Sequence, residues 1–138
     1  MKRKQISSDI LKNAGLKITN ERKAVLDLLI KTSTPMSAND LWNKLSAKMN
    51  QATVYRILKQ LVKSRILYQT DFREAQTFYE YQHKHHHHII CTACGKKELL
   101  RLCLPRQLER KVKNASKIFK GNLDHTLEFF GTCNSCEK

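Results

Sequence analysis

Apolar positions in the first half of the chain repeat with the period of an α-helix. The clearest stripe falls at i, i+3, i+4, i+7 and i+8, and consists of Val54, Ile57, Leu58, Leu61 and Val62. Because the opposite face is basic and polar, this segment predicts an amphipathic helix with one exposed side. Three earlier helices are predicted over residues 7–14, 19–31 and 37–45. Thr19 is the expected N-cap of the second, and Ser37 with Asp40 forms a capping-box-like start for the third.

The periodicity then changes to that of strands. Two short runs rich in aromatic and β-branched residues, 66–70 and 77–81, flank a polar turn at 71–76, which predicts a β-hairpin. Helices followed by a two-stranded wing are the order of a winged helix-turn-helix, in which the last helix lies in the major groove of DNA.

The second half mixes strands with one helix. Strands are predicted over 85–91, 97–102 and 123–131, and a helix from Pro105 to about Phe119. Leu108, Val112 and Ala115 are expected to point inward from that helix. A β-β-α-β unit this small has an exposed sheet edge and little core, so it would be more stable as a homodimer. The predicted fold class is α+β: a winged-helix DNA-binding domain with its wing and hinge over 1–82, and a small α/β dimerisation domain over 83–138.

Charge favours a polyanionic partner. The 138 residues include 26 Lys and Arg against 12 Asp and Glu, a formal net charge of +14 shared by both halves. A merely soluble basic surface is the alternative. We see no apolar run that could span a membrane and no signal segment after the basic start, so a cytoplasmic protein is expected. Reducing conditions there favour metal ligation over disulfides.

Two Cys-x-x-Cys pairs, Cys91/Cys94 and Cys133/Cys136, flank most of the second half. Four thiolates would close a tetrahedral structural zinc site with no open position for a substrate. Disulfides fit poorly because the cysteine count is odd, and thioredoxin-like surroundings for a redox motif are missing. Nor does the sequence contain His-Glu-x-x-His or a similar arrangement, so we do not expect an enzyme.

Five of the six histidines fall in the run 83–88. If this segment is extended, His85 and His87 face one side of the strand and His86 and His88 face the other. One segment could then serve two metal sites. Imidazole and carboxylate ligands together suit zinc, iron(II) or manganese(II).

Several short motifs are specific in their order and spacing. They are Ala14-Gly15-Leu16-Lys17-Ile18-Thr19-x-x-Arg22, Ser37-Ala38-x-Asp40-Leu41, Ala52-Thr53-Val54-Tyr55-Arg56, His85-His86-His87-His88-Ile89-Ile90-Cys91-x-x-Cys94-Gly95 and His125-x-x-Glu128-x-x-Gly131-x-Cys133-x-x-Cys136. Together they make the chain resemble the ferric uptake regulator (Fur) family of metal-dependent bacterial repressors. The resemblance implies a winged-helix domain, a short hinge and an α/β dimerisation domain.

The resemblance also implies roles for single residues at the DNA. Tyr55 and Arg56 match the family's groove-contacting pair, Lys17 a minor-groove lysine and Arg22 a contact to the DNA backbone. The partner would be double-stranded DNA with an AT-rich inverted repeat, because a two-fold dimer reads two half-sites.

Two further metal sites follow from the same resemblance. Glu80, His86 and His88 would form the sensing site. A second site on the dimerisation domain would use His85, His87, Glu109 and His125.

Departures from the family pattern bear on the metal. Pro35 and Met36 stand where many iron-sensing members carry a histidine, and Leu99 stands where an acidic ligand often follows the first knuckle. Glu98 is one position off. Fewer ligands favour tetrahedral zinc, so a zinc-sensing repressor is the leading hypothesis. The alternatives are an iron, manganese or peroxide sensor of the same family, and a constitutive DNA-binding protein with structural zinc only.

Cys103 could be an apolar strand residue, or a redox or ligand residue.

Overall fold

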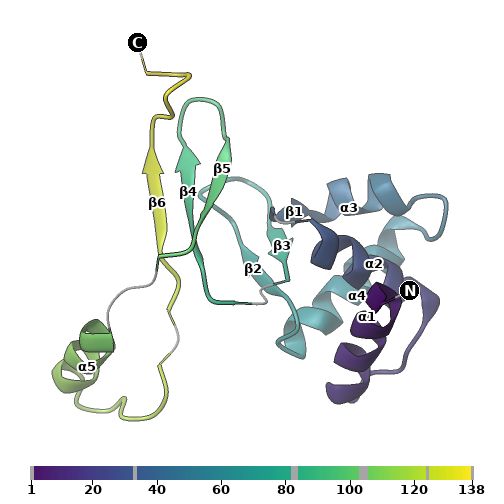
Figure 1. The fold of residues 1–138 in the computed structure, drawn as a ribbon, viewed down its shortest axis with the longest axis horizontal. Coiled ribbons are helices and arrows are strands. Elements are labelled where there is room, and N and C mark those ends of the chain that lie inside the picture. Colours follow the sequence, from purple (N-terminus) through teal and green to yellow (C-terminus); the bar gives the residue numbers. More distant parts are fainter. Residues whose placement is uncertain (1, 33, 82–83, 103–105, 124, 138) are drawn as a thin grey trace. The chain divides into compact units, whose positions relative to one another are not determined.

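The computed structural model describes residues 2–32, 34–81, 84–102, 106–123 and 125–137, which form two compact units. The first unit runs from Met1 to His83 and the second from Lys84 to Lys138. Helices dominate the first and strands the second (Figure 1), which confirms the α+β class. None of the described helices is long and apolar enough to cross a membrane.

Four helices make up most of the first unit: α1 (Lys2–Asn13), α2 (Asn20–Lys31), α3 (Ala38–Leu45) and α4 (Gln51–Lys63). The last three begin at side-chain caps on Thr19, Ser37 and Asn50, and each cap oxygen accepts a hydrogen bond from the backbone N–H three residues on. α1 begins earlier than the predicted Ser7, because the residues before it include good helix formers and neither glycine nor proline.

The core of the first unit lies where these helices meet. Its fully buried members are supplied by all four helices and include Leu11, Leu26, Leu41 and Leu58, each 0% exposed. The apolar stripe of α4 faces this core through Val54, Ile57, Leu58 and Leu61. Because that face is buried, the opposite face of α4 is the one left for a partner.

A three-stranded antiparallel sheet completes the first unit. Its order is β1 (Met36–Ser37), β3 (Phe78–Glu80) and β2 (Tyr68–Thr70). The β2–β3 hairpin is the predicted wing, whereas β1 was not predicted, because two residues are too few to show alternation. β1 pairs Met36 with Tyr79, so the wing is anchored beside the start of α3.

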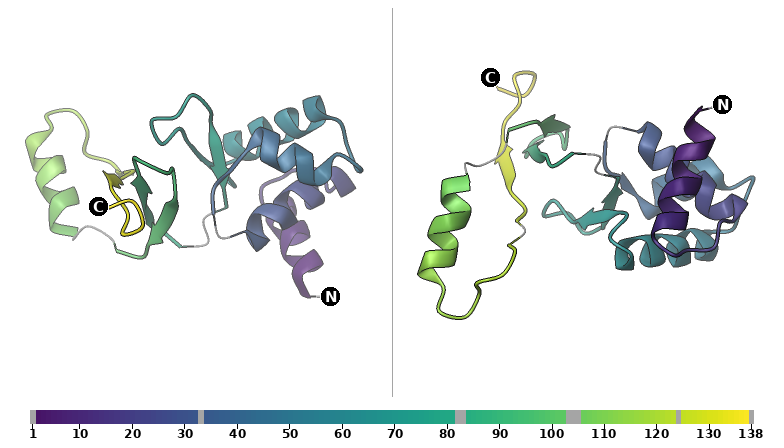
Figure 2. Two further views of the ribbon diagram at one scale, coloured as in Figure 1. Left: turned by 90° about the horizontal axis from the view of Figure 1, so that it is seen from above. Right: turned by 60° about the horizontal axis from the view of Figure 1, so that its bottom comes forward.

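The second unit is built on a sheet of β4 (His87–Cys91), β5 (Lys97–Leu100) and β6 (Glu128–Gly131), in the order β5-β4-β6. β4 and β5 are antiparallel, and β4 and β6 are parallel. A parallel pair needs a long crossover. Here that connection contains α5 (Arg106–Ala115), as Figure 2 shows.

The described helix α5 does not bury its apolar side within the chain. Leu108 and Val112 are 42% and 49% exposed, and Ala115 is also exposed. The expectation that these residues point inward is therefore wrong for a single chain. The helix also ends before Phe119, and the last strand covers only the end of the predicted 123–131. Pro105, Cys103 and His83 lie outside the described residues.

Candidate metal centres and nucleic-acid interface

Each Cys-x-x-Cys pair forms a tight turn at the same end of the second sheet. In the first, the Gly95 N–H donates to the carbonyl of Cys91 at 2.9 Å, and Gly95 has a φ of +73° that a side chain would disfavour. In the second, the Cys136 N–H donates to the carbonyl of Cys133 at 2.8 Å. The parallel pairing of Cys91 with Gly131 brings the two turns together.

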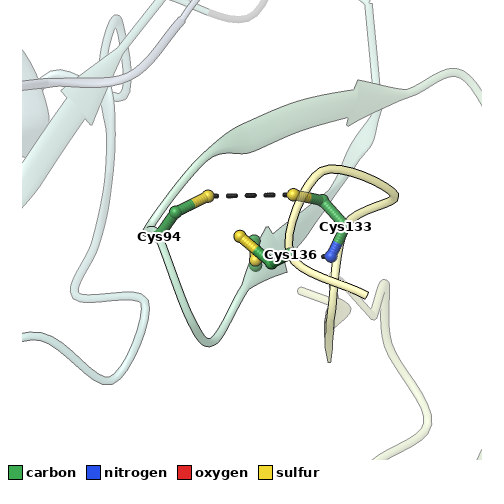
Figure 3. Close-up of side chains that lie close together, drawn as sticks. Cys94, Cys133 and Cys136 are labelled. Atoms are coloured by element: carbon green, nitrogen blue, oxygen red, sulfur yellow. Dashed lines mark hydrogen bonds between the residues drawn. The ribbon is translucent and has the colours of Figure 1, made fainter. Parts of the chain in front are cut away.

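The four sulfurs converge on one point. The Sγ atoms of Cys91, Cys94, Cys133 and Cys136 all lie within 4.8 Å of one another, and those of Cys94 and Cys133 are 3.8 Å apart (Figure 3). In a tetrahedral zinc site with Zn–S bonds of about 2.3 Å, the sulfurs are about 3.8 Å apart. The donor set and its spacing therefore fit zinc.

The surroundings of the first and last of these sulfurs differ. The backbone N–H of Cys133 donates to Cys91 Sγ at 3.3 Å, and this bond, with another from Cys94, lowers the pKa of Cys91 to about 6. The neighbouring thiols of Cys133 and Cys94 raise the pKa of Cys136 to about 12. The Cys91 thiolate is thus stabilised by backbone N–H groups, whereas the neighbouring thiols favour the protonated form of Cys136.

A second cluster joins three imidazoles on one side of β4. Ligand nitrogens of His85, His87 and His125 lie within 4.8 Å of one another, and the Nε2 atoms of His85 and His87 are 3.3 Å apart. His125 comes from the segment before β6. Burial, followed by the nearby His85 and His125, lowers the pKa of His87, which favours the neutral imidazole that binds metals. Three imidazoles whose ligand nitrogens lie this close together fit a zinc or similar divalent ion.

Glu109 does not belong to this three-histidine cluster. It lies in the first turn of α5 and is exposed. Its part in the second site stays a prediction.

Within the four consecutive histidines 85–88, the other two, His86 and His88, pair with each other. The rings of His86 and His88 are 4.9 Å apart and nearly perpendicular, and the His88 side chain is buried. Adjacent residues of an extended segment alternate between faces, which explains how four consecutive histidines divide into two pairs. Glu80, the third residue of the predicted sensing site, is the last residue of β3 in the other unit. The grouping of Glu80 with His86 and His88 in one metal site stays a prediction.

The exposed side of α4 is polar and basic. Tyr55 is 49% exposed at the start of the helix, and Arg56 beside it is exposed. Arg56 also lines a recess shared with the first turn of α2, whose other lining residues include Thr19, Arg22, Lys48, Asn50, Thr53 and Gln60. Three basic side chains, Arg22, Lys48 and Arg56, and one acidic side chain, Glu21, line this recess, so its lining carries net positive charge.

Lys17 lies in the loop between α1 and α2, and its side chain is exposed. Arg22 is half-buried, and its guanidinium donates to the Lys17 carbonyl and to Gln60 Oε1. The bond to Gln60 was not foreseen, because 38 positions separate the two residues and no local pattern connects them.

The family model for the ferric uptake regulator family matches residues 13–130. The chain belongs to the ferric uptake regulator family. It is 32% identical to the ferric uptake regulation protein of Neisseria gonorrhoeae over 134 residues, covering 92% of this chain and 90% of that protein. It is 29% identical to the peroxide operon regulator of Bacillus subtilis, covering 94% and 90%.

Solved structures agree on the fold of this Fur-family chain. The iron-bound ferric uptake regulator of Francisella tularensis shares 30% identity at a TM-score of 0.68, covering 88% of this chain and 95% of that one. The Helicobacter pylori regulator has a TM-score of 0.73 at 24% identity, covering 99% and 93%. The chain is therefore a metal-responsive transcriptional regulator that binds DNA, and not an enzyme.

One departure from the Fur-family pattern has a clear structural consequence here. Pro35 and Met36, which replace the histidine region of many iron-sensing members, are buried, and Met36 pairs with the wing strand in β1. Neither side chain offers a nitrogen or oxygen ligand. These two side chains therefore have a packing role in the first unit.

Proposed function

We propose that this regulator is a zinc-responsive repressor that binds an AT-rich inverted-repeat operator as a homodimer. The observation that carries the proposal is the division of residues 85–88, in and just before β4, into two imidazole pairs, His85 with His87 and His86 with His88. One of them, His86 and His88, would join Glu80 in the sensing site.

The choice of zinc rests on the small number of donors. His86, His88 and Glu80 supply two imidazoles and one carboxylate, whereas Pro35 and Met36 add none. Three protein ligands and a fourth position suit tetrahedral zinc better than six-coordinate iron(II) or manganese(II). Iron(II) is the second candidate, because relatives of 30% identity or more carry the name ferric uptake regulation protein.

The switch would work through chain segments on either side of the connection between the units. Glu80 ends the wing strand β3, whereas His86 directly precedes β4 and His88 lies within it. Ligation of one ion by all three would restrain the connecting segment and fix the spacing of the two recognition helices in the dimer. A restrained state that matches the half-sites binds DNA better, and DNA in turn tightens metal binding.

Homodimerisation is supported by apolar side chains that the single chain leaves exposed. In the second unit these include Leu108 and Val112 on α5 and Phe129 on β6. Exposed apolar surface of this kind marks an interaction site, and a second copy of the chain is the partner that a two-fold operator requires. Zinc held by the four cysteines would secure the end of the same sheet.

The deciding experiment is fluorescence anisotropy with an inverted-repeat duplex, titrated against buffered free zinc, iron(II) or manganese(II) under anaerobic conditions. A steep gain in affinity at trace free zinc is expected. A gain with iron(II) or manganese(II) alone would reassign the metal. Tight operator binding before any of these metals is added would indicate a constitutive DNA-binding protein with structural zinc only.

A further inference from the structure

Arg22, on the first turn of α2, makes side-chain hydrogen bonds to two segments that are distant from each other in the sequence. Its Nη1 donates to the backbone carbonyl of Lys17 in the α1–α2 loop, and its Nη2 donates to Gln60 Oε1 on α4 at 2.9 Å. A guanidinium is planar and rigid, and its donors diverge at fixed angles. One side chain therefore fixes the loop relative to the helix.

These two segments carry the proposed DNA contacts. Lys17 presents its side chain to solvent from the loop, while its own carbonyl is held by Arg22. Gln60 follows Arg56 by four residues, so both lie on the same exposed face of α4. Arg22, Arg56 and Gln60 also line the same recess. The bridge thus connects the residue predicted for the minor groove to the helix predicted for the major groove.

Resting on the proposed DNA-binding function, we propose that Arg22 is a positioning residue. It sets the distance between Lys17 and the reading face of α4, and contributes to DNA affinity through them rather than as a phosphate anchor. Its half-burial fits this role, since Lys17 and Arg56 are exposed whereas Arg22 is enclosed between its acceptors. A loop ordered in advance loses less conformational freedom when DNA binds.

A positioning role and a phosphate contact predict different mutational patterns. A phosphate contact depends on the charge of Arg22, so lysine should replace it well. Its loss should lower the slope of log affinity against log salt by about 1. A bridge depends on reaching two acceptors at once, which a single ammonium group does not do. Loss of the bridge should leave the slope unchanged.

The test is a double-mutant cycle on the full-length chain with its metals, using the operator duplex well below the unfolding temperature. We expect Arg22→Ala, Arg22→Lys and Gln60→Ala each to weaken binding about tenfold, as for one hydrogen bond to a charged group. The double variant Arg22→Ala/Gln60→Ala should be no weaker than Arg22→Ala alone. Lys23→Ala is the charge-matched control from the neighbouring position, and its effect should simply add to that of Gln60→Ala.

Several results would overturn the proposal. Wild-type affinity in Arg22→Lys, additive losses in the cycle, or a reduced salt slope in Arg22→Ala would identify a phosphate anchor. A lower melting temperature with unchanged operator affinity would identify a purely structural bridge. If Arg22→Ala does not fold, Lys17→Ala is compared in wild type and in Gln60→Ala. The loss of operator affinity caused by Lys17→Ala should be smaller in Gln60→Ala than in wild type. An equal loss in both would contradict the bridge. Failure of the proposed function is distinct, because wild type and variants would then all bind operator and random duplex equally.

Discussion

Cys91, the last residue of β4, pairs in parallel register with Gly131, the last residue of β6. Two residues beyond Gly131 the chain reaches Cys133, whose N–H donates to Cys91 Sγ. Cys91 and Cys133 begin the two Cys-x-x-Cys turns and are 42 positions apart. The register of one parallel strand pair therefore decides whether these two turns share one ion. A slip of one residue would turn the side chains of β6 to the opposite face of the sheet and separate the sulfurs.

Removal of one thiol should release the metal ion from the proposed four-cysteine zinc site. Cys133→Ser is expected to lose the bound zinc and to unfold the second unit, because a small sheet with little core depends on the metal. Zinc content by elemental analysis and circular dichroism on heating measure this. Ser135→Ala, inside the same knuckle, is the matched control and should keep both. Full zinc content in Cys133→Ser would contradict the four-cysteine site.

The two faces of the histidine run should separate in function. His86→Ala/His88→Ala is expected to abolish the gain in operator affinity on adding metal, because it removes two of three proposed sensing ligands. His85→Ala/His87→Ala should keep that gain. Anisotropy titrations against free metal report it, and zinc retained at the cysteines shows that the fold survives. The reverse pattern would exchange the roles of the two sites.

Tyr55 should contribute to reading thymine. Tyr55→Ala is expected to weaken operator binding about tenfold, within the range for loss of one good base contact. Tyr68→Ala, which also removes an exposed tyrosine ring, is the control and should bind as wild type. Replacing operator thymines by uracil should weaken wild type but leave Tyr55→Ala unchanged. Thymine carries a methyl group that uracil lacks. Equal sensitivity of both proteins to uracil would therefore exclude a contact between the Tyr55 ring and that methyl group.

The exposed side of α5 should belong to the dimer interface. Val112→Lys is expected to raise the dimer dissociation constant at least about tenfold, since burying an unpaired charge costs several kcal/mol. Analytical ultracentrifugation measures the constant. Lys111→Ala, at the preceding exposed position of α5, is the control. An unchanged dimer in Val112→Lys would place the interface elsewhere on the second unit.

The α4 stripe should dominate the stability of the first unit. Leu58→Ala is expected to lower the free energy of unfolding by about 2–5 kcal/mol, because the side chain is fully buried and leaves a cavity. Lys59→Ala, exposed on the same helix, should change it by less than about 0.5 kcal/mol. Urea denaturation followed by circular dichroism compares them. Similar losses in both variants would contradict this packing.

The sequence by itself determined the features that depend on neighbours along the chain. The stripe from Val54 to Leu61, the caps at Thr19 and Ser37, the alternating histidines and the Cys-x-x-Cys spacing all show local periodicity or fixed short separations. Tertiary structure decided what depends on distant segments. It paired β1 with β3, joined Arg22 to Gln60, and left the apolar side of α5 exposed, whereas the grouping of His125 with His85 and His87 was already implied by the family resemblance. Contacts between residues tens of positions apart arise from packing and strand register, which leave no period in the sequence.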